Sequence, residues 1–198
     1  MYTYNRFVGH NEVGDSPAFF GITNEEFHAR MQDRKKRWPL TMNATSTHDT
    51  KRGEDVRTRL NVLPELADEW IAVVKEWQRI NAPKKSLGMP DSNDEYFIYQ
   101  TLIGALPFQE DNTFGQRLEA YLQKSLRESK RNSDWASPNE TYEKATIDFA
   151  LRLLNRGDRF WKSFEKFNTT VSDFGIVNSL AQVLLKFTCP GIPDIYQG

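Results

Sequence analysis

The residues whose types and spacing are best suited to chemistry lie in one short stretch, Thr45 to Arg57. Eight of its thirteen residues carry a hydroxyl, imidazole or carboxylate group, and His48 is adjacent to Asp49. Lys51 follows two residues later. Nearby cations and hydroxyl donors favour the charged form of a carboxylate. We therefore expect Asp49 to meet positive charge rather than to give up a proton.

The sequence on either side of this stretch indicates how it is positioned. Residues 40–44 form a short apolar run before it, and a helical pattern begins near Glu54. This order predicts a strand that passes through a polar loop into a helix. A second interpretation is a solvated loop with a helix cap, because the start of a helix favours acidic residues such as Glu54 and Asp55. Residue types alone favour the second interpretation.

The same thirteen residues resemble the signature of maltooligosyltrehalose synthase, a glucosylmutase of the α-amylase superfamily. In that superfamily a His-Asp pair ends the seventh strand of a TIM barrel, and its Asp is the third of three catalytic carboxylates. The resemblance therefore implies that Asp49 is catalytic. It also implies that His48, Lys51 and Arg52 bind substrate.

The resemblance covers nearly the whole chain. Residues 2–6 are similar to a Tyr-x-Tyr-Asn-Arg run at the end of the sixth barrel strand, which implies substrate contact by Tyr4 and Arg6. Residues 10–14 follow the family pattern Leu-Asn-Glu-Val-Gly in part, with His in place of Leu. Residues 190–198 resemble the Pro-Gly-x-Pro-x-x-Tyr-x-Gly run that leads into strand eight.

The implied reaction converts the reducing-end α-1,4 linkage of a maltooligosaccharide into an α,α-1,1 (trehalose) linkage by intramolecular transglucosylation. This is retaining glycosidase chemistry, in which the released glucose captures the glycosyl-enzyme intermediate. The family's nucleophile and acid/base belong to barrel strands four and five, upstream of Met1. We therefore expect the chain alone to be inactive, with a maltooligosaccharide and the rest of the parent barrel as its partners.

The expected fold is mainly α, a helical bundle subdomain inserted in a TIM barrel, with one or two short strands or extended segments at the ends. A crossover between consecutive barrel strands normally needs one helix, whereas six or seven are predicted here. We expect residues 1–53 to be a barrel-derived segment with the active-site loop. Residues 54–188 form the helical insertion, and residues 189–198 begin strand eight.

Some local patterns give sharper expectations. Thr23 and Glu26 have the spacing of a capping box at a helix start. Two aromatic-rich helices, at 158–167 and 172–187, are predicted to form an antiparallel pair joined by a turn at Asn168–Thr170, with their apolar stripes in the core. The segment 193–196 is expected to be an unpaired extended tail.

Composition limits the classes of partner. A net charge of −1 and a pI near 6.3 argue against nucleic acid or an anionic membrane. The single cysteine, Cys189, excludes an internal disulfide, and no apolar run is long enough for a bilayer. The N-terminus lacks a signal-peptide core, so we expect a cytoplasmic location. Three histidines without ligand spacing predict no metal, and no cofactor is expected.

Two alternatives from other classes remain open. One is a non-catalytic helical module for carbohydrate binding or interaction, in which residues 45–57 only cap a helix. The other is a different α-amylase superfamily glucanotransferase or hydrolase. The Thr-Lys-Arg-Gly-Glu-Asp run that follows His48 and Asp49 argues against the second alternative.

Overall fold

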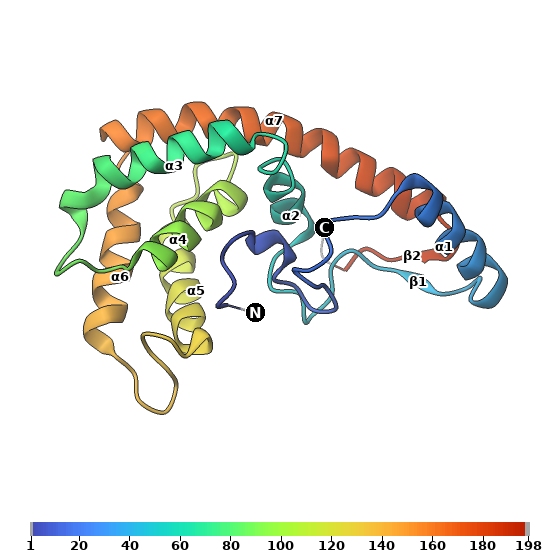
Figure 1. The fold of residues 1–198 in the computed structure, drawn as a ribbon, viewed down its shortest axis with the longest axis horizontal. Coiled ribbons are helices and arrows are strands. Elements are labelled where there is room, and N and C mark those ends of the chain that lie inside the picture. Colours follow the sequence, from blue (N-terminus) through green and yellow to red (C-terminus); the bar gives the residue numbers. More distant parts are fainter. Residues whose placement is uncertain (1, 197–198) are drawn as a thin grey trace.

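Helices make up most of the chain in the computed structural model, which describes residues 2–196 (Figure 1). Within that range the elements are η1 (a 3-10 turn, Val8–His10), α1 (Asn24–Arg37), β1 (Met42–Asn43), α2 (Glu54–Leu60), α3 (Ala67–Asn81), η2 (a 3-10 turn, Ala82–Lys84), α4 (Ser92–Ala105), α5 (Phe114–Ser129), α6 (Glu140–Leu153), α7 (Arg159–Thr188) and β2 (Ile192–Pro193). The predicted mainly helical fold with short strands near its ends is confirmed. The described residues do not include Met1, the first residue of the predicted segment 1–53, or Gln197 and Gly198, the last two residues of the predicted segment 189–198.

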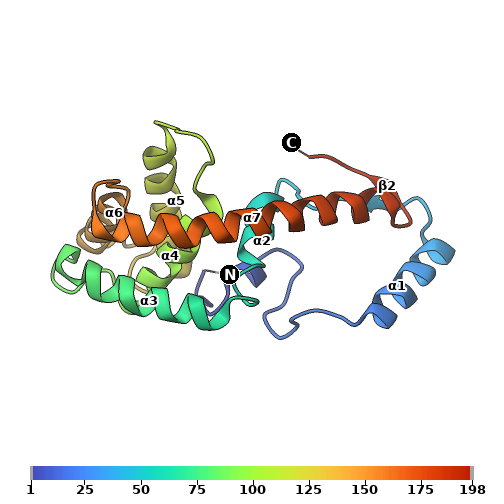
Figure 2. The same cartoon turned by 90° about the horizontal axis from the view of Figure 1, so that it is seen from above.

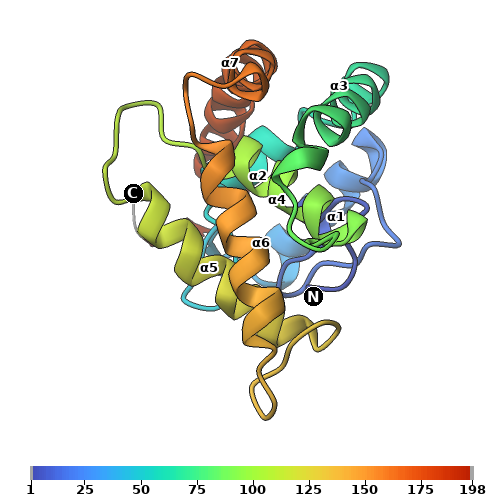
Figure 3. The ribbon, with the colours of Figure 1, turned by 90° about the vertical axis from the view of Figure 1, so that its left-hand side faces the viewer.

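The long helix α7 joins the two ends of the molecule. Helices α3 to α6 gather around its first half, whereas α1, β1 and β2 lie at its far end (Figures 1 and 2). Seen from the bundle end, α5 and α6 pack side by side (Figure 3). No helix within residues 2–196 has the length and apolar character needed to cross a membrane.

The prediction of two antiparallel helices in the last third of the chain is wrong, because α7 runs unbroken for 30 residues. The expected turn at Asn168–Thr170 contains no glycine or proline to end a helix. Thr169 instead donates its hydroxyl to the Glu165 carbonyl, 2.9 Å away, within the helix. Phe167 and Val171, on either side of the expected turn, are both buried, so packing against the bundle keeps the helix continuous.

The core of the bundle is an aromatic cluster around Trp77 of α3, whose side chain is fully buried. Its indole N–H donates to Ser163 Oγ on α7, 3.0 Å away, which satisfies its one polar group. Five rings have centroids 5.4–6.1 Å from that of Trp77, those of Trp70, Tyr99, Phe160, Phe164 and Phe167. This cluster joins α3 and α4 to the first half of α7.

The second half of α7 has a different environment from the one predicted. Its apolar side chains were expected in the core, but most of them are exposed, and the expectation is wrong for this half. The bundle helices reach only the first half of α7, so the remaining apolar side chains are left uncovered (Figure 1). The exposed residues are Phe174, Ile176, Val177, Leu180, Val183, Leu184, Leu185 and Phe187.

Helix α2, which follows the loop of interest, is held between α4 and α7 by close backbone approaches. A Cβ atom at Gly104 of α4 would lie 2.8 Å from Val56 Cγ1. A Cβ atom at Gly175 of α7 would lie 2.8 Å from Arg59 Cγ and 3.2 Å from Arg59 Cα. Glycine at both positions therefore lets α2 sit deep against its neighbours, which sets the end of the loop relative to the bundle.

Strand β1 pairs in parallel with β2, with Met42 opposite Ile192 and Asn43 opposite Pro193. The Ile192 N–H donates to the Thr41 carbonyl at 2.8 Å, and the Asp194 N–H donates to the Asn43 carbonyl at 3.1 Å. The expectation of an unpaired tail at 193–196 is therefore wrong for its first residues. Parallel pairing of strands that are connected through helices is the arrangement of a βαβ unit.

The side chain of Asn43 ties this strand pair to two helices. Its Nδ2 lies 3.3–3.4 Å from the carbonyl oxygens of Lys186, Cys189 and Pro190, just where α7 ends. Its Oδ1 accepts a hydrogen bond from Arg34 of α1 at 2.8 Å. Gly191 has a φ of +133°, and a Cβ atom there would lie 2.6 Å from Asn43 Oδ1. Glycine is therefore required where the chain turns from α7 into β2.

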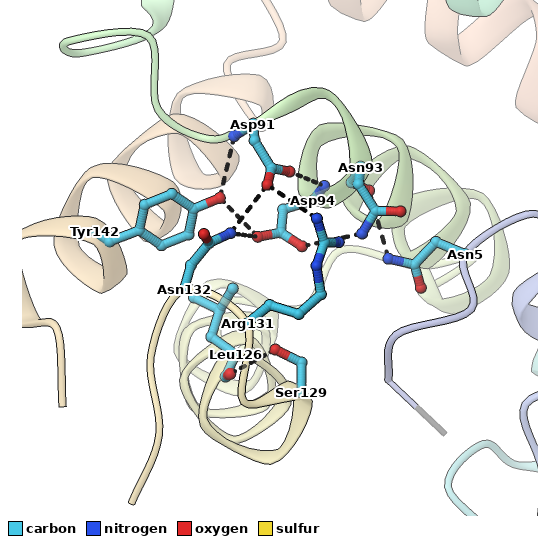
Figure 4. Close-up of polar contacts among 9 residues, drawn as sticks. All are labelled: Asn5, Asp91, Asn93, Asp94, Leu126, Ser129, Arg131, Asn132 and Tyr142. Atoms are coloured by element: carbon cyan, nitrogen blue, oxygen red, sulfur yellow. Dashed lines mark hydrogen bonds and ion pairs between the residues drawn. The ribbon is translucent and has the colours of Figure 1, made fainter. Parts of the chain in front are cut away.

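A polar cluster at the start of α4 holds the bundle helices and the N-terminal segment together (Figure 4). Asp91 caps α4, since its Oδ1 accepts from the Asp94 N–H at 2.8 Å. The buried Asp94 accepts from Tyr142 of α6 at 2.7 Å and from Asn132 at 3.1 Å. Burial raises the pKa of Asp91, but hydrogen bonds from Asp94 and Asn132 outweigh it and hold that pKa below its ordinary value.

Candidate active-site loop

Between β1 and α2, residues 45–53 form a loop with a tight turn at its centre. The Thr50 N–H and the Thr50 hydroxyl both donate to the Thr47 carbonyl, at 3.2 and 2.8 Å. The Asp49 N–H donates to Thr47 Oγ1 at 3.2 Å. These bonds place His48 and Asp49 at the two central positions of the turn, in the loop that follows the carboxyl end of β1. The predicted order of strand, polar loop and helix is observed.

The side chains of His48 and Asp49 both face solvent, with 79% and 60% of their areas exposed. His48 Nε2 lies 3.4 Å from Asp49 Oδ2. Even when the imidazole is protonated, an exposed pair of this kind contributes only between roughly 0 and 1 kcal/mol to stability. Folding therefore gives little reason for this pair to be present, and both groups are open to a ligand.

The beginning of the loop is fastened to α2 and α7 through Glu54. The Glu54 carboxylate accepts hydrogen bonds from the hydroxyl of Thr45 and from the ammonium group of Lys186, which is 3.0 Å away and buried. The Glu54 N–H donates to Ser46 Oγ at 3.1 Å. Burial raises the pKa of Glu54, but the bonds from Thr45 and Lys186 outweigh it and hold that pKa below its ordinary value.

The end of the loop is fastened to the N-terminal segment through Glu12. The Lys51 N–H donates to Glu12 Oε1 at 2.7 Å, and the Arg52 N–H donates to Glu12 Oε2 at 3.0 Å. The only sequence signal for Glu12 was its place in the partly matched pattern at residues 10–14. That signal assigned it no role.

The guanidinium of Arg52 points into the chain, where its side chain is buried. Its Nη2 donates to Tyr121 Oη at 3.0 Å, and its Nη1 donates to the Asn11 carbonyl at 3.4 Å. Its Cζ lies 5.9 Å from the centre of the Phe97 ring. Arg52 therefore uses much of its hydrogen-bonding capacity inside the chain, and its assignment as a sugar ligand stays a prediction.

Lys51 differs from its neighbour, because its side chain is half-buried and borders a cavity of about 210 Å³ beside the loop. Apolar side chains from α2, α4 and α5 form much of the cavity wall, and Arg117 of α5 adds a second cation. Lys51 therefore borders open space and lies two residues after Asp49.

Tyr4 and Arg6 lie on an N-terminal segment that packs against α4. Gln100 of α4 is fully buried and donates to the Asn5 carbonyl at 2.8 Å, while its Oε1 accepts from the Val8 N–H at 2.9 Å. Asn11 donates its side-chain amide to the Tyr4 carbonyl. Tyr4 is half-buried and Arg6 exposed. The structure thus joins this segment to the loop through residues 11 and 12, although the two lie 40 residues apart in sequence.

The N-terminal segment and the loop also meet at two tyrosines. The pKa of Tyr2 is raised to about 12, mainly by burial and also by the neighbouring Tyr121 phenol, although the Arg52 guanidinium acts to lower it. Burial also raises the pKa of Tyr121. Both phenols are therefore neutral hydrogen-bonding groups at physiological pH, and they line the inner side of the loop around Arg52.

The whole chain is similar to maltooligosyl trehalose synthases. It is 35% identical over 200 residues to a protein of Mycobacterium tuberculosis that is described provisionally as such an enzyme, and it spans 25% of that relative's length. A crystal structure of a maltooligosyl trehalose synthase matches 100% of the chain with a TM-score of 0.90 and 38% identity, over 26% of its own length.

A second solved structure gives the same result. The structure of a hypothetical maltooligosyl trehalose synthase from Sulfolobus tokodaii matches the full chain at 40% identity and a TM-score of 0.88, over 27% of its own length. No protein-family model matches the chain. The resemblance predicted from residues 45–57 is therefore confirmed in sequence and in fold, and the chain spans about a quarter of the length of the relatives that it matches.

Proposed function

We propose that this chain, which corresponds to about a quarter of a maltooligosyl trehalose synthase, supplies the third catalytic carboxylate of such an enzyme. That carboxylate is Asp49. The reaction is the conversion of the reducing-end α-1,4 linkage of a maltooligosaccharide into an α,α-1,1 linkage. The observation that supports this most directly is the exposed pair of His48 and Asp49, which lies in the loop that follows the carboxyl end of β1.

That location is favourable for catalysis for a general reason. In (β/α)8 barrels the active site is built from the loops that follow the carboxyl ends of the parallel strands. The loop between β1 and α2 is such a loop, and β1 has a parallel neighbour in β2. A charged Asp49 there would stabilise the positive charge that develops on the anomeric carbon in the transition state.

The other loop and N-terminal residues would handle the sugar. For transfer to exceed hydrolysis, the freed glucose must be held and turned while water is kept away. We assign this role first to Lys51, which borders open space beside the loop, and then to His48. Tyr4 and Arg6 would contact the substrate from the neighbouring segment. Arg52, bound below the loop to Tyr121, would support the loop from inside.

The remainder of such an enzyme is the partner that this function requires. Two barrel strands do not close an eight-stranded barrel, and the proposal places the nucleophile and the acid/base on strands that are not among these 198 residues. The uncovered apolar side of α7 is suited to packing against more protein. We therefore propose that the chain alone is inactive and that the complete enzyme works in the cytoplasm.

The test is Asp49→Asn in the longer enzyme that contains this chain, assayed with maltohexaose for loss of reducing ends. We expect the variant to fold, as judged by circular dichroism, and to be slowed by about three orders of magnitude, near the upper end for the loss of one preorganised electrostatic group. Asp148→Asn, the same change at a half-exposed residue of α6, is the matched control. Activity of Asp49→Asn within a few-fold of the control would instead favour a non-catalytic helical module.

A further inference from the structure

Glu12 is a buried carboxylate whose hydrogen bonds are made largely with the loop that carries Asp49. Only 7% of its surface is exposed. A buried carboxylate is costly unless donors surround it. Glu12 has three backbone donors, because the N–H groups of Val13, Lys51 and Arg52 lie 3.0, 2.7 and 3.0 Å from its two oxygens. Two of the three come from a segment about 40 residues away in sequence.

The two N–H groups from the loop belong to successive residues, and one carboxylate oxygen binds each of them. This two-point contact fixes the orientation of the peptide between Lys51 and Arg52 as well as its distance from Glu12. The Lys51 side chain leaves from that peptide, and Asp49 lies two residues before it. Hydrogen bonds that involve an ionised acceptor are roughly twice as strong as neutral ones.

The rest of the loop is held differently. At its beginning, Glu54 binds Thr45 and Ser46, and in its middle the turn at 47–50 is closed by bonds within the loop itself. These contacts leave the direction of the last loop residues open. At the end of the loop, the Arg52 guanidinium is held by Tyr121 and the Asn11 carbonyl. Glu12 adds the contact that sets the backbone of Lys51 and Arg52 against the N-terminal segment.

We propose that Glu12 is a positioning residue, which sets the loop backbone so that Asp49 and Lys51 act on the substrate together. This role rests on the function proposed above. It predicts an effect on the outcome of the reaction, because a displaced Lys51 would hold the freed glucose poorly while the glycosyl-enzyme intermediate still formed. A residue that only stabilised the fold would change the amount of folded enzyme and leave the product ratio unaltered.

The contact itself is measurable on the present chain without any variant. We expect scalar couplings across the hydrogen bonds, from the amide nitrogens of Lys51 and Arg52 to the side-chain carboxyl carbon of Glu12, in NMR spectra of labelled chain. Absence of both couplings, with the resonances assigned, would overturn the proposal. This measurement does not depend on activity.

The variant Glu12→Gln tests the strength of the contact. The amide nitrogen of Gln would face one of the two backbone donors, so one hydrogen bond is lost and the other is no longer assisted by charge. We expect hydrogen exchange at the Lys51 and Arg52 amides to become about 10- to 100-fold faster, the change expected for a lost hydrogen bond to a charged group. Glu119→Gln, at an exposed residue of α5, should leave both rates unchanged. Unchanged rates in Glu12→Gln would contradict the proposal.

In the longer enzyme, we expect Glu12→Gln to lower kcat about 10-fold or more with a smaller change in KM, a loss comparable with that of one hydrogen bond made to a charged group. The ratio of glucose released to trehalose ends formed should rise, whereas Glu119→Gln should keep both values. If Asp49→Asn is inactive but Glu12→Gln keeps the parent's kcat and product ratio, the positioning role is wrong and the proposed function stands. If both variants retain full activity, both proposals fail.

Discussion

At the scale of single residues, the loop depends on charges that lie beneath it. Glu54 binds Thr45 and Ser46 at the beginning of the loop and Lys186 of α7, whose ammonium group is buried. A buried ammonium group is stable only when it has a charged or strongly accepting partner. The exposed pair of His48 and Asp49 is thus presented by a framework whose own charges are partly or fully shielded from water.

The variant Glu54→Gln tests this framework through its pH dependence. The pKa of Glu54 is lower in the folded chain than its ordinary value of 4.5. The ionised carboxylate therefore stabilises the fold fully above pH 4.5, and this stabilisation is lost as the pH falls through the lower pKa of the folded state. At pH 7 we expect the free energy of unfolding of the variant, measured by urea titration, to be about 1–3 kcal/mol lower than that of the parent. The difference should shrink as the pH is lowered below 4.5. A difference that does not vary with pH would contradict this explanation.

At the scale of elements, the position of the loop depends on how closely α2 approaches α7. At Gly175 a Cβ atom would overlap the side-chain stem and approach the backbone of Arg59, neither of which moves easily. Overpacking of this kind typically costs about 1–3 kcal/mol, against a gain of up to ~1 kcal/mol in helix propensity. If α2 moved away from α7, the end of the loop, which leads directly into α2, would move with it.

We therefore expect Gly175→Ala to lower the free energy of unfolding by roughly 1 kcal/mol. The matched control is Gly115→Ala in α5, where a Cβ atom would lie 3.7 Å from Leu151 Cδ2, an ordinary contact. That control should leave stability unchanged or raise it. Urea unfolding curves of the three chains measure both effects, and equal stability of the two variants would show that α2 has room to shift.

At the scale of the whole molecule, the second half of α7 is the main departure from an ordinary globular surface. Monomeric soluble proteins rarely expose contiguous apolar patches larger than a few hundred Å². Here eight large apolar residues between 174 and 187 are exposed, on the side of the molecule that also carries β1 and β2 (Figure 1). Under the function proposed above, the remainder of the enzyme covers this surface.

The variant Leu180→Lys tests whether this apolar surface is uncovered in the isolated chain. Leu180 is 67% exposed, so the change should alter stability by no more than about 0.5 kcal/mol. It should lower the fluorescence of the dye ANS bound to the isolated chain and reduce self-association in sedimentation runs. Val171→Ala, at a fully buried residue in the half of the same helix that packs against the bundle, should instead cost at least about 1 kcal/mol. If Leu180→Lys destabilises the chain as much as Val171→Ala, α7 is covered within the chain itself.

Local patterns in the sequence determined most of the elements. The capping box at Thr23 and Glu26 is present, with hydrogen bonds of 3.2 and 2.8 Å in its two directions. The helical periodicity of residues 54–188 predicted a mainly helical chain, and the order strand, polar loop, helix around Asp49 is observed. These features depend on residues within a few positions of one another, which is why their sequence is sufficient to predict them.

Tertiary structure decided what depends on distant partners. Packing of Phe167 and Val171 against the bundle made α7 one helix, although the polar residues between them suggested a turn. The pairing of β2 with β1, the inward direction of Arg52 and the contact of Glu12 with the loop all join segments about 40 to 150 residues apart. Sequence placed Asp49 in a polar loop between a strand and a helix, but only long-range contacts determine how that loop is held, because those contacts leave no local pattern.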